Sequence, residues 1–393
     1  MSSLPSLLSM MSQLIATPSI SCSQVSWDQS NKGVILLLED WLSSLGFQCE
    51  VMPLPEQPDK CNLIATLGQG SGGLVLSGHT DTVPYDEDRW KSDPFSLQER
   101  DNKLYGLGTC DMKGFFAIVI DTLRDMDLTK LQQPLIILAT ADEESSMEGA
   151  RALVDAGKPK ARYALIGEPT SMTPIHAHKG IMMEKIRITG QAGHSSNPNL
   201  GNSALDAMHS VLSELMQYRQ HLKDTYRDAS FVIDYPTMNF GCIHGGDSPN
   251  RICGRCELEF DLRALPGMNN QALLEDISAL LPKIERNTGT KIQLNQLFPS
   301  VPSFSTKRES DIIQACERLT NKSAETVAFA TEGGYLNQLG METLILGPGS
   351  IDQAHQPNEF MALDQIKPMQ HVINGLVKRY CISPNNENEA SRV

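Results

Sequence analysis

The sequence alternates short apolar runs with helical patterns over much of its first half. Leu135–Thr140 reads Leu-Ile-Ile-Leu-Ala-Thr and predicts a buried strand, and Leu74–Ser77 and Tyr163–Ile166 are further strand candidates. Helical patterns at Met112–Met126 and Glu148–Ala156 separate these runs. Strands that alternate with helices in this way predict an α/β fold, in which helices flank a mostly parallel sheet on both faces.

The pattern changes after about Lys179. Amphipathic strands at Glu184–Thr189 and Cys256–Arg263 flank helical patterns at Ala204–Gln217 and Asn270–Asn287. Two strand–helix units side by side indicate a small α+β domain inserted into the larger one. We therefore expect a first segment of the larger domain at 1–179, an inserted domain at 180–290, a second segment at 291–382 and a disordered tail at 383–393.

Composition and charge exclude several classes of protein. The formal net charge is −14, whereas a nucleic-acid partner or an anionic membrane requires a basic surface. No window approaches the ~18 consecutive apolar residues of a membrane helix, and residues 1–27 lack the features of a secretory signal. The nine cysteines are scattered and odd in number, which argues against a disulfide framework. We expect a soluble, cytoplasmic protein.

Imidazole and carboxylate side chains follow the predicted strands at the points where these end. His79 comes directly after the strand at 74–77, and Glu144 comes shortly after the strand at 135–140. Three others complete the set: Glu168 after the strand at 163–166, His355 beyond a strand at 343–346, and Asp111 at the start of a helix. Ligands bind at the carboxyl ends of the strands in open α/β sheets. The five residues are therefore expected at one edge of the sheet.

Each member of this set also has an ordinary structural explanation. A lone histidine after a strand is more often a hydrogen-bonded surface residue than a ligand. Adjacent glutamates such as Glu143 and Glu144 often begin a solvated helix, where the helix dipole favours carboxylates. Asp111 would serve equally well as a helix N-cap. The placement of all five at strand ends of one sheet is much less expected by chance, so the set as a whole predicts a metal site.

The ligand types then select the metal. Two imidazoles and three carboxylates suit zinc, with cobalt or manganese as substitutes, and an oxygen-rich set argues against copper. Two Zn²⁺ per subunit balance the charges, because three carboxylates and one bridging hydroxide neutralise two divalent ions. One carboxylate must then bridge the ions, which would lie about 3.5–4 Å apart.

Two further acidic residues have predicted roles beside the ligands. Asp81 is placed to accept the other ring N–H of His79 and so fix its tautomer, although a turn-forming aspartate is an equal alternative. Neighbouring side chains of an extended segment point in opposite directions, so Glu143 would face the bridging water if Glu144 binds metal. Glu143 is therefore a candidate general base that later protonates the leaving amine. Zinc lowers the pKa of bound water from ~15.7 towards ~7.

Several stretches carry a family resemblance: Gly-His-Thr-Asp-Thr-Val-Pro at 78–84, Gly-Leu-Gly-Thr-Cys-Asp-Met-Lys-Gly at 106–114, Ala-Asp-Glu-Glu at 141–144, Gly-Glu-Pro-Thr at 167–170 and Gly-His-Ser-Ser at 193–196. In these stretches the chain resembles the M20 family of metallopeptidases and deacylases. Further stretches resemble its bacterial branch that deacetylates N2-acetyl-ornithine, at 15–21, 244–247, 250–253 and 346–357. The resemblance covers nearly the whole chain except the tail.

The resemblance implies how the metal ligands divide between two ions. Asp111 would bridge the pair, and the peptide bond after it would be cis. His79 and Glu168 would complete one zinc site. Glu144 and His355 would complete the other. Relatives can carry Asp in place of Glu168, and Glu at this position fits the deacetylase branch.

The resemblance also implies roles for residues around the metal ions. Asp81 would stand behind His79, and Glu143 would be the general base, in agreement with the roles expected from the residues alone. The inserted domain would be a dimerisation domain and lid for the catalytic domain. Its His194 would act in the active site of the partner as a donor to the tetrahedral oxyanion. The catalytic unit would then be a homodimer.

Candidates for substrate binding come in part from the resemblance and in part from the residues themselves. Asn250 and Arg263 match positions that contact a substrate carboxylate in related deacylases, and Arg251 is equally well placed. Gly333 and Gly334 would let the backbone approach a ligand closely. The alternatives are a salt bridge on the sheet face for Arg263 and a plain turn for the two glycines.

The expected reaction is hydrolysis of the small N-acyl amino acid N2-acetyl-L-ornithine to L-ornithine and acetate, in arginine biosynthesis. A metal-bridging hydroxide activated by Glu143 would be the nucleophile. Another M20 deacylase or peptidase, such as a succinyl-diaminopimelate desuccinylase or a dipeptidase, is the alternative within the family. A non-catalytic metal-binding protein is the alternative from another class, and the presence of Glu143 disfavours it because such a protein needs no base.

Overall fold

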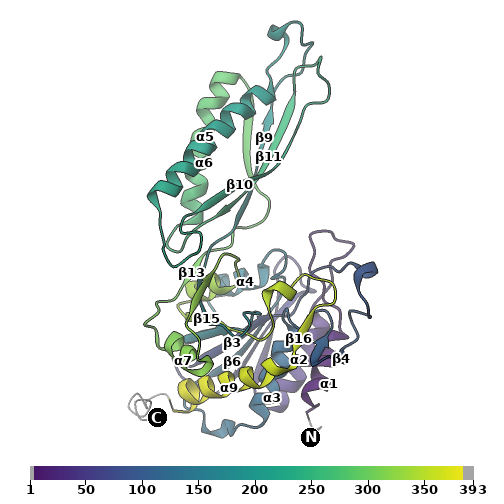
Figure 1. Cartoon of the computed structure of the whole chain (residues 1–393), viewed down its shortest axis with the longest axis vertical. Helices are drawn as coiled ribbons and strands as arrows, with labels where there is room; N and C mark the ends of the chain where they lie inside the picture. Colours follow the sequence, from purple (N-terminus) through teal and green to yellow (C-terminus); the bar gives the residue numbers. More distant parts are fainter. Residues whose placement is uncertain (1–3, 384–393) are drawn as a thin grey trace. The chain divides into compact units, whose positions relative to one another are not determined.

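A computed structural model describes residues 4–383 of the chain (Figure 1). The chain divides into two compact units, which we describe separately. Unit 1 contains the residues up to His176, residues 305–325 and those from Glu332 onward. Unit 2 contains Ala177–Phe304 and Thr326–Thr331. Of the tail expected to be disordered, all but Ser383 lies outside the described residues.

A nine-stranded sheet forms the core of unit 1, in the order β1-β2-β6-β3-β7-β15-β8-β13, with β14 paired to β8. Its strands are β1 (Gln48–Pro53), β2 (Cys61–Leu67), β3 (Leu74–His79), β6 (Leu135–Thr140), β7 (Tyr163–Ile166), β8 (Ile175–His178), β13 (Phe304–Ser305), β14 (Glu325–Val327) and β15 (Glu342–Ile345). The central strands β6, β3, β7 and β15 are parallel neighbours. Every residue of β3 and β6 is buried, as parallel strands covered on both faces require. The predicted α/β class is confirmed.

Helices cover this sheet in two groups. The helices of unit 1 are α1 (Leu7–Ile15), α2 (Lys32–Ser44), α3 (Lys113–Arg124), α4 (Glu148–Ala156), α7 (Asp311–Thr320), α8 (Gly333–Gln338) and α9 (Ile366–Val377). α3 contacts α1, α2 and α9, and α7 contacts α9, whereas α4 contacts α8. α3 is buried on nearly every side because its apolar residues occupy all faces of the helix. A small separate sheet joins β4 (Gln98–Arg100), β5 (Lys103–Tyr105) and β16 (Phe360–Ala362).

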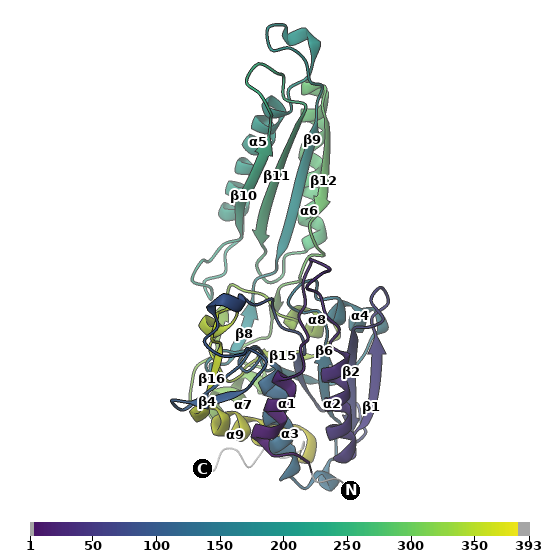
Figure 2. The same ribbon diagram turned by 90° about the vertical axis from the view of Figure 1, so that its right-hand side faces the viewer.

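Unit 2 is a four-stranded antiparallel sheet with two helices. The strand order is β10-β11-β9-β12, and the elements are β9 (Met182–Thr189), β10 (Thr237–Gly245), β11 (Arg255–Arg263), β12 (Lys291–Gln296), α5 (Ala204–Thr225) and α6 (Asn270–Thr288). Residues of β9 alternate between buried and half-buried positions, as expected when one face of a sheet packs on helices and the other meets water. Figure 2 shows both helices behind the strands of this sheet. α5 begins at the N-cap Ser203 and α6 at the N-cap Asn269.

The structure differs from the expected organisation of this region in three places. β12 pairs with β9 along its whole length, so unit 2 continues to Phe304 rather than ending at residue 290. β10 was not expected, because it lies at the sheet edge and most of its residues are half-buried or exposed. α5 continues to Thr225, well beyond Gln217, because its last turns are largely polar and give little apolar periodicity.

Two findings concern the chemistry and environment of the whole described chain. No helix among residues 4–383 combines the length and the apolar character that crossing a lipid bilayer requires. All nine cysteines are free thiols, and six of them are buried. The expected cytoplasmic location stays a prediction.

Glu184 makes the stability of unit 2 depend on pH. Its side chain shares the buried face of β9 with Met182 and Ile186, and burial raises the pKa of Glu184 to about 7. The folded chain therefore holds the Glu184 proton more tightly than the unfolded chain, and this stabilisation is lost as pH rises through about 7. We predict that β9 amides exchange hydrogen faster at pH 8.5 than at pH 6, after correction for intrinsic exchange rates.

Glu184→Gln should remove most of this corrected pH dependence, because its side chain does not ionise. The exposed Glu275 on α6 provides the control variant Glu275→Gln, which should behave as the unmodified chain does. Equal pH dependence in the Glu184→Gln variant would contradict the assignment.

Candidate metal centre

The five predicted metal ligands all belong to unit 1. His79 is the last residue of β3, Glu144 lies in the turn after β6, and Glu168 lies two residues beyond β7. His355 lies beyond β15, and Asp111 lies in the loop before α3. The four central parallel strands end at the same edge of the sheet, which accounts for the convergence of these segments.

Two glycines allow α3 and its leading residue to pack against the strand ends that carry ligands. A Cβ atom at Gly78, before His79, would lie 2.4 Å from the Met112 side chain. A Cβ atom at Gly167, before Glu168, would lie 2.4 Å from the ring of Phe115. In the Gly-His and Gly-Glu pairs of the sequence, a predicted ligand therefore follows a glycine that leaves space for close packing.

The Asp111 carboxylate lies between two imidazoles. Its Oδ1 is 3.0 Å from His79 Nε2, and its Oδ2 is 3.6 Å from His355 Nε2. His79 Nε2 is also 3.7 Å from Glu168 Oε1. His355 Nε2 is also 2.9 Å from Glu144 Oε2. Each imidazole thus faces one oxygen of Asp111 and one glutamate, which is the arrangement that a bridging carboxylate would need. The peptide bond between Asp111 and Met112 is cis.

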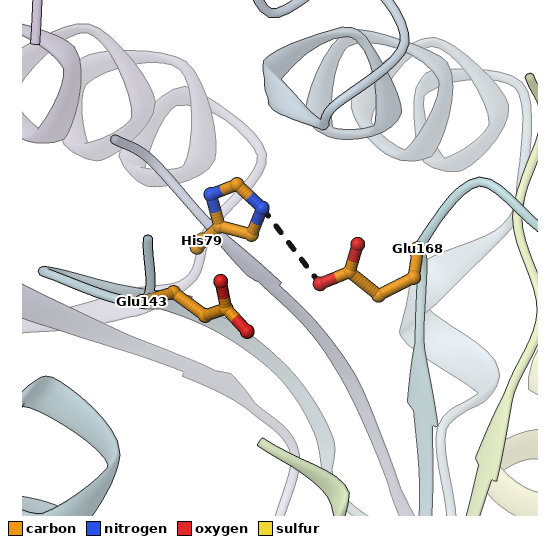
Figure 3. A group of neighbouring side chains, drawn as sticks. All are labelled: His79, Glu143 and Glu168. Atoms are coloured by element: carbon orange, nitrogen blue, oxygen red, sulfur yellow. Dashed lines mark ion pairs between the residues drawn. The ribbon is translucent and has the colours of Figure 1, made fainter. Parts of the chain in front are cut away.

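Two overlapping groups of side chains offer ligand atoms within 4.8 Å of one another. One group is His79, Asp111 and Glu144, and the other is His79, Glu143 and Glu168. Figure 3 shows the second group, with the carboxylates of Glu143 and Glu168 directed toward the imidazole. By position alone, Glu143 is therefore suited either to bind a metal ion or to act on a water molecule beside it.

Glu143 and Glu144 were expected in an extended segment, but the structure places them in a turn. Residues 143–146 form a turn, and the preceding Asp142 has a φ of 64°. The two glutamates nevertheless approach different groups of ligand atoms. The inference that they face different partners is thus consistent with the turn, although the alternation of side chains along a strand is not its cause.

Asp81 contacts both His79 and the turn after β6. His79 Nδ1 lies 3.0 Å from the backbone carbonyl of Asp81 and 3.7 Å from its carboxylate Oδ1. A proton on Nδ1, donated to this carbonyl, leaves Nε2 free to face Asp111 and Glu168. The second carboxylate oxygen of Asp81 accepts a hydrogen bond from Glu144 N at 3.0 Å. Asp81 thereby links two of the predicted ligands.

Burial controls the charges in this centre. It raises the pKa of Glu143 and of Glu168 well above the ordinary value, and neighbouring carboxylates raise both further. Burial alone would lower the pKa of His79, but its hydrogen bond to Asp111 and the charge of Glu168 raise it. The hydrogen bond to Glu144 raises the pKa of His355 to about 9. Carboxylates this close together in a buried site favour the binding of cations.

Glu359 holds the loop that carries Asp111, and the sequence analysis did not identify it. Its Oε1 accepts hydrogen bonds from the backbone N–H groups of Gly108, Cys110 and Asp111 at 3.0, 2.8 and 3.0 Å. Successive N–H groups that converge on one point form an anion-binding nest. The glycine-rich Gly-Leu-Gly-Thr-Cys-Asp stretch was the available signal. Glu359 follows His355 by four residues, so one segment carries a predicted ligand, His355, and also anchors the loop of another, Asp111.

Glu332 is a second acidic residue that the sequence analysis missed. It directly precedes Gly333 and Gly334, the buried glycines that begin α8. Glu332 is itself 1% exposed, and burial raises its pKa to about 7. Its charge raises the pKa of Glu143 and of Glu168. The two glycines thus begin a buried helix beside this acidic group, and their predicted contact with substrate stays a prediction.

The remaining predicted residues belong to unit 2. Ser195 N donates to the carbonyl of Asn250 at 3.1 Å, and His194 forms a β-bridge with Arg251. The structure therefore brings His194, Asn250 and Arg251 together on exposed loops. Arg263 lies at the other end of β11, about 25 Å along the strand from Arg255. Its guanidinium pairs with Asp261 on the sheet at 3.0 Å.

The comparison with protein families decides the classification. Residues 75–379 match the model of peptidase family M20/M25/M40. The chain belongs to this family. Among curated members, the acetylornithine deacetylase of Photorhabdus laumondii is 49% identical over 97% of this chain and 99% of its own length. That of Pasteurella multocida is 50% identical over 97% of this chain and its full length.

Solved structures share the fold at much lower identity. The aminopeptidase PepT of Bacillus cereus matches with a TM-score of 0.74 and 16% identity, over 95% of this chain and 97% of its own. The YXEP protein of Bacillus subtilis, described as a dinuclear metal binding peptidase, matches with a TM-score of 0.65 and 16% identity, over 94% and 96%. The family resemblance seen in the sequence motifs is confirmed.

We predict that Glu359→Ala weakens zinc binding. The substitution leaves the N–H groups of Gly108, Cys110 and Asp111 without their common acceptor, so the Asp111 loop loses its anchor. Loss of a residue that orients a ligand lowers metal affinity about 10- to 100-fold, which competition with a chromophoric chelator measures. Glu359→Gln keeps an acceptor oxygen and should lose less. Unchanged affinity in the alanine variant would show that the loop orders itself without Glu359.

Proposed function

We propose that the chain is an acetylornithine deacetylase that hydrolyses N2-acetyl-L-ornithine to L-ornithine and acetate in arginine biosynthesis. Two lines of support agree. Curated acetylornithine deacetylases match it at 49–50% identity over almost their whole length. In unit 1, one oxygen of Asp111 faces His79 and the other faces His355. This division of one carboxylate between two imidazoles is the observation that carries the proposal.

The centre would hold two divalent metal ions, most suitably zinc, with cobalt or manganese as substitutes. The donor set fits, because it combines two imidazoles with buried carboxylates that lie close together, and burial together with neighbouring carboxylates raises the pKa of Glu143 and of Glu168. Asp111 would bridge the ions, with His79 and Glu168 on one side. Glu144 and His355 would lie on the other. When bound, such ions polarise the amide carbonyl and lower the pKa of water.

Side chains of the protein would transfer the protons during hydrolysis. Glu143 would take a proton from the attacking water and give it to the amide nitrogen as the C–N bond breaks. Burial and the neighbouring carboxylates of Glu168 and Glu144 raise the pKa of Glu143, which strengthens it as a proton acceptor. Asp81 would hold His79 in one tautomer through the 3.0 Å contact of Nδ1 with its carbonyl.

A homodimer would complete the site, with His194 of the partner subunit as donor to the tetrahedral oxyanion. Exposed loops carry the motif Gly-His-Ser-Ser beside Asn250 in unit 2. β10 is an edge strand whose residues from Cys242 to Gly245 are exposed, and such an edge can pair with a second chain. We place the enzyme in the cytoplasm, where its nine free cysteines would remain reduced.

A substrate panel tests the proposed activity. The purified enzyme should show its highest kcat/KM on N2-acetyl-ornithine among acetyl-ornithine, acetyl-methionine, succinyl-diaminopimelate and dipeptides. Activity should disappear on exhaustive chelation and return with zinc or cobalt, because the donor set has no catalytic substitute for the ions. A dipeptide with the highest kcat/KM would instead assign a peptidase, and full activity after chelation would exclude the metal mechanism.

Glu143→Ala tests whether Glu143 is a base or a ligand. As a base, its loss should lower kcat by about 10²–10⁴-fold while the variant retains two metal ions by elemental analysis. Glu144→Ala should lose metal, because Glu144 would be a ligand. The exposed Glu99 on β4 provides a control, since Glu99→Ala should change neither quantity. Metal loss from the Glu143→Ala variant would make Glu143 a ligand.

A further inference from the structure

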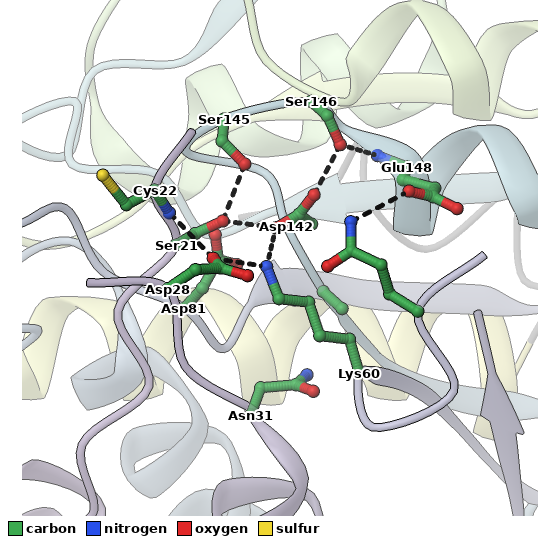
Figure 4. Close-up of polar contacts among 12 residues, drawn as sticks. Ser21, Cys22, Asp28, Asn31, Lys60, Asp81, Asp142, Ser145, Ser146 and Glu148 are labelled. Carbon is green, nitrogen blue, oxygen red and sulfur yellow. Dashed lines mark hydrogen bonds and ion pairs between the residues drawn. The ribbon is translucent and has the colours of Figure 1, made fainter. Parts of the chain in front are cut away.

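A buried network of charged and hydroxyl side chains adjoins the turn that carries Glu143 and Glu144 (Figure 4). The turn starts at Asp142, whose φ of 64° lies in the left-handed region that residues other than glycine seldom adopt. The carbonyl of Asp142 accepts hydrogen bonds from Ser146 N at 3.1 Å and Met147 N at 2.7 Å. These bonds close the segment that we call the 142–147 turn.

The carboxylate of Asp142 forms hydrogen bonds both within this turn and to residues outside it. Its Oδ2 accepts a hydrogen bond from the hydroxyl of Ser146 at 2.5 Å. Its Oδ1 accepts hydrogen bonds from the hydroxyl of Ser21 and from Lys60 Nζ. The hydroxyls of Ser21 and Ser145 lie 2.7 Å apart. The orientation of the turn therefore depends on groups far away in the sequence.

Lys60 connects Asp142 to a third part of unit 1. It directly precedes β2, and its side chain is 6% exposed. Its Nζ also donates to Asp28 Oδ1 at 2.7 Å, and the same oxygen accepts from Cys22 N at 2.9 Å. Burial alone would lower the pKa of Lys60, but its hydrogen bonds to Asp142 and Asp28 outweigh burial and raise it. Lys60 is therefore charged at neutral pH.

We propose that Lys60 is a positioning residue for the hydrolysis: through Asp142 it fixes the 142–147 turn and hence the places of Glu143 and Glu144. Asp142 is the neighbour of Glu143, so a rotation of the turn about Asp142 displaces both glutamates relative to His79. Lys60 contacts this hinge directly from the position that precedes β2. The proposal rests on the proposed function, in which Glu143 exchanges protons and Glu144 binds metal.

The competing explanation is that the Lys60–Asp142 ion pair only stabilises the fold. The two explanations predict different values of kcat for a variant in which both residues are replaced by uncharged ones. Removing Lys60 alone leaves the Asp142 carboxylate buried without its cation, which is strongly destabilising in any protein. Removing both charges is often tolerated by the fold. If Lys60 only stabilises, the neutral pair should restore kcat. If it positions the turn, stability should recover while kcat stays low, because the strong link from β2 to Asp142 is still missing.

The experiment compares Lys60→Met, the double variant Lys60→Met with Asp142→Asn, and a matched control in the zinc-loaded full chain. Lys158→Met is the control, because it removes an exposed ion pair with Glu50 in the same unit. We expect the double variant to unfold at the same urea concentration as the unmodified enzyme and to bind two zinc ions. Its kcat should be about 10-fold or more lower, with KM within about twofold. Lys60→Met should have a still lower kcat.

Replacing zinc with Co²⁺ provides a spectroscopic measurement that a change in stability alone would leave unchanged. The visible absorption of bound Co²⁺ depends on ligand geometry, so the double variant should show a changed spectrum because Glu144 is displaced. Lys158→Met should leave kcat and the spectrum unchanged. A double variant with the kcat and Co²⁺ spectrum of the unmodified enzyme would overturn the proposal, and it does so even if Lys60→Met fails to fold. Failure of the unmodified enzyme on N2-acetyl-ornithine would overturn the proposed substrate only, since the variants can be compared on whichever substrate the panel identifies.

Discussion

Repulsion among buried carboxylates at one edge of the sheet is the constraint that unit 1 must satisfy. Asp111, Glu143, Glu144 and Glu168 converge there around His79 because parallel strands end together. Burial and mutual charge raise the pKa of the three glutamates. A fold can keep such a group together only if something holds each segment against this repulsion. The surrounding structure shows how two of these segments are held.

Two of the acidic segments are anchored by different sets of hydrogen bonds. Three backbone N–H groups hold the Asp111 loop on Glu359. The turn with Glu143 and Glu144 is fastened through Asp142, which contacts Lys60 and two serine hydroxyls. These anchors lie outside the set of ligand atoms but determine where those atoms are. The cluster is therefore preorganised for cations, which lowers the conformational cost of binding them.

The sequence was sufficient to predict the central sheet and the ligand-type residues at its edge. Apolar runs such as Leu135–Thr140 are continuous because both faces of the strand are buried, and the ligands follow these runs directly. Local pattern could not predict β10 or the end of unit 2, since an exposed edge strand lacks a clear alternation. It also missed Glu359 and the role of Lys60. Each pairs with a residue at least 82 positions away, and no periodicity records such a contact.

The separation between Asp111 and its anchor has a consequence for how a ribosome makes this protein. The sheet of unit 2 is complete once β12 has emerged, whereas the central sheet of unit 1 still lacks β15 between β7 and β8. At that stage the loop of Asp111 still lacks its hydrogen-bond acceptor, because Glu359 has not been synthesised. A nascent chain therefore exposes the Asp111 loop before its anchor exists, and the loop can gain its three hydrogen bonds to Glu359 only after translation has passed residue 359.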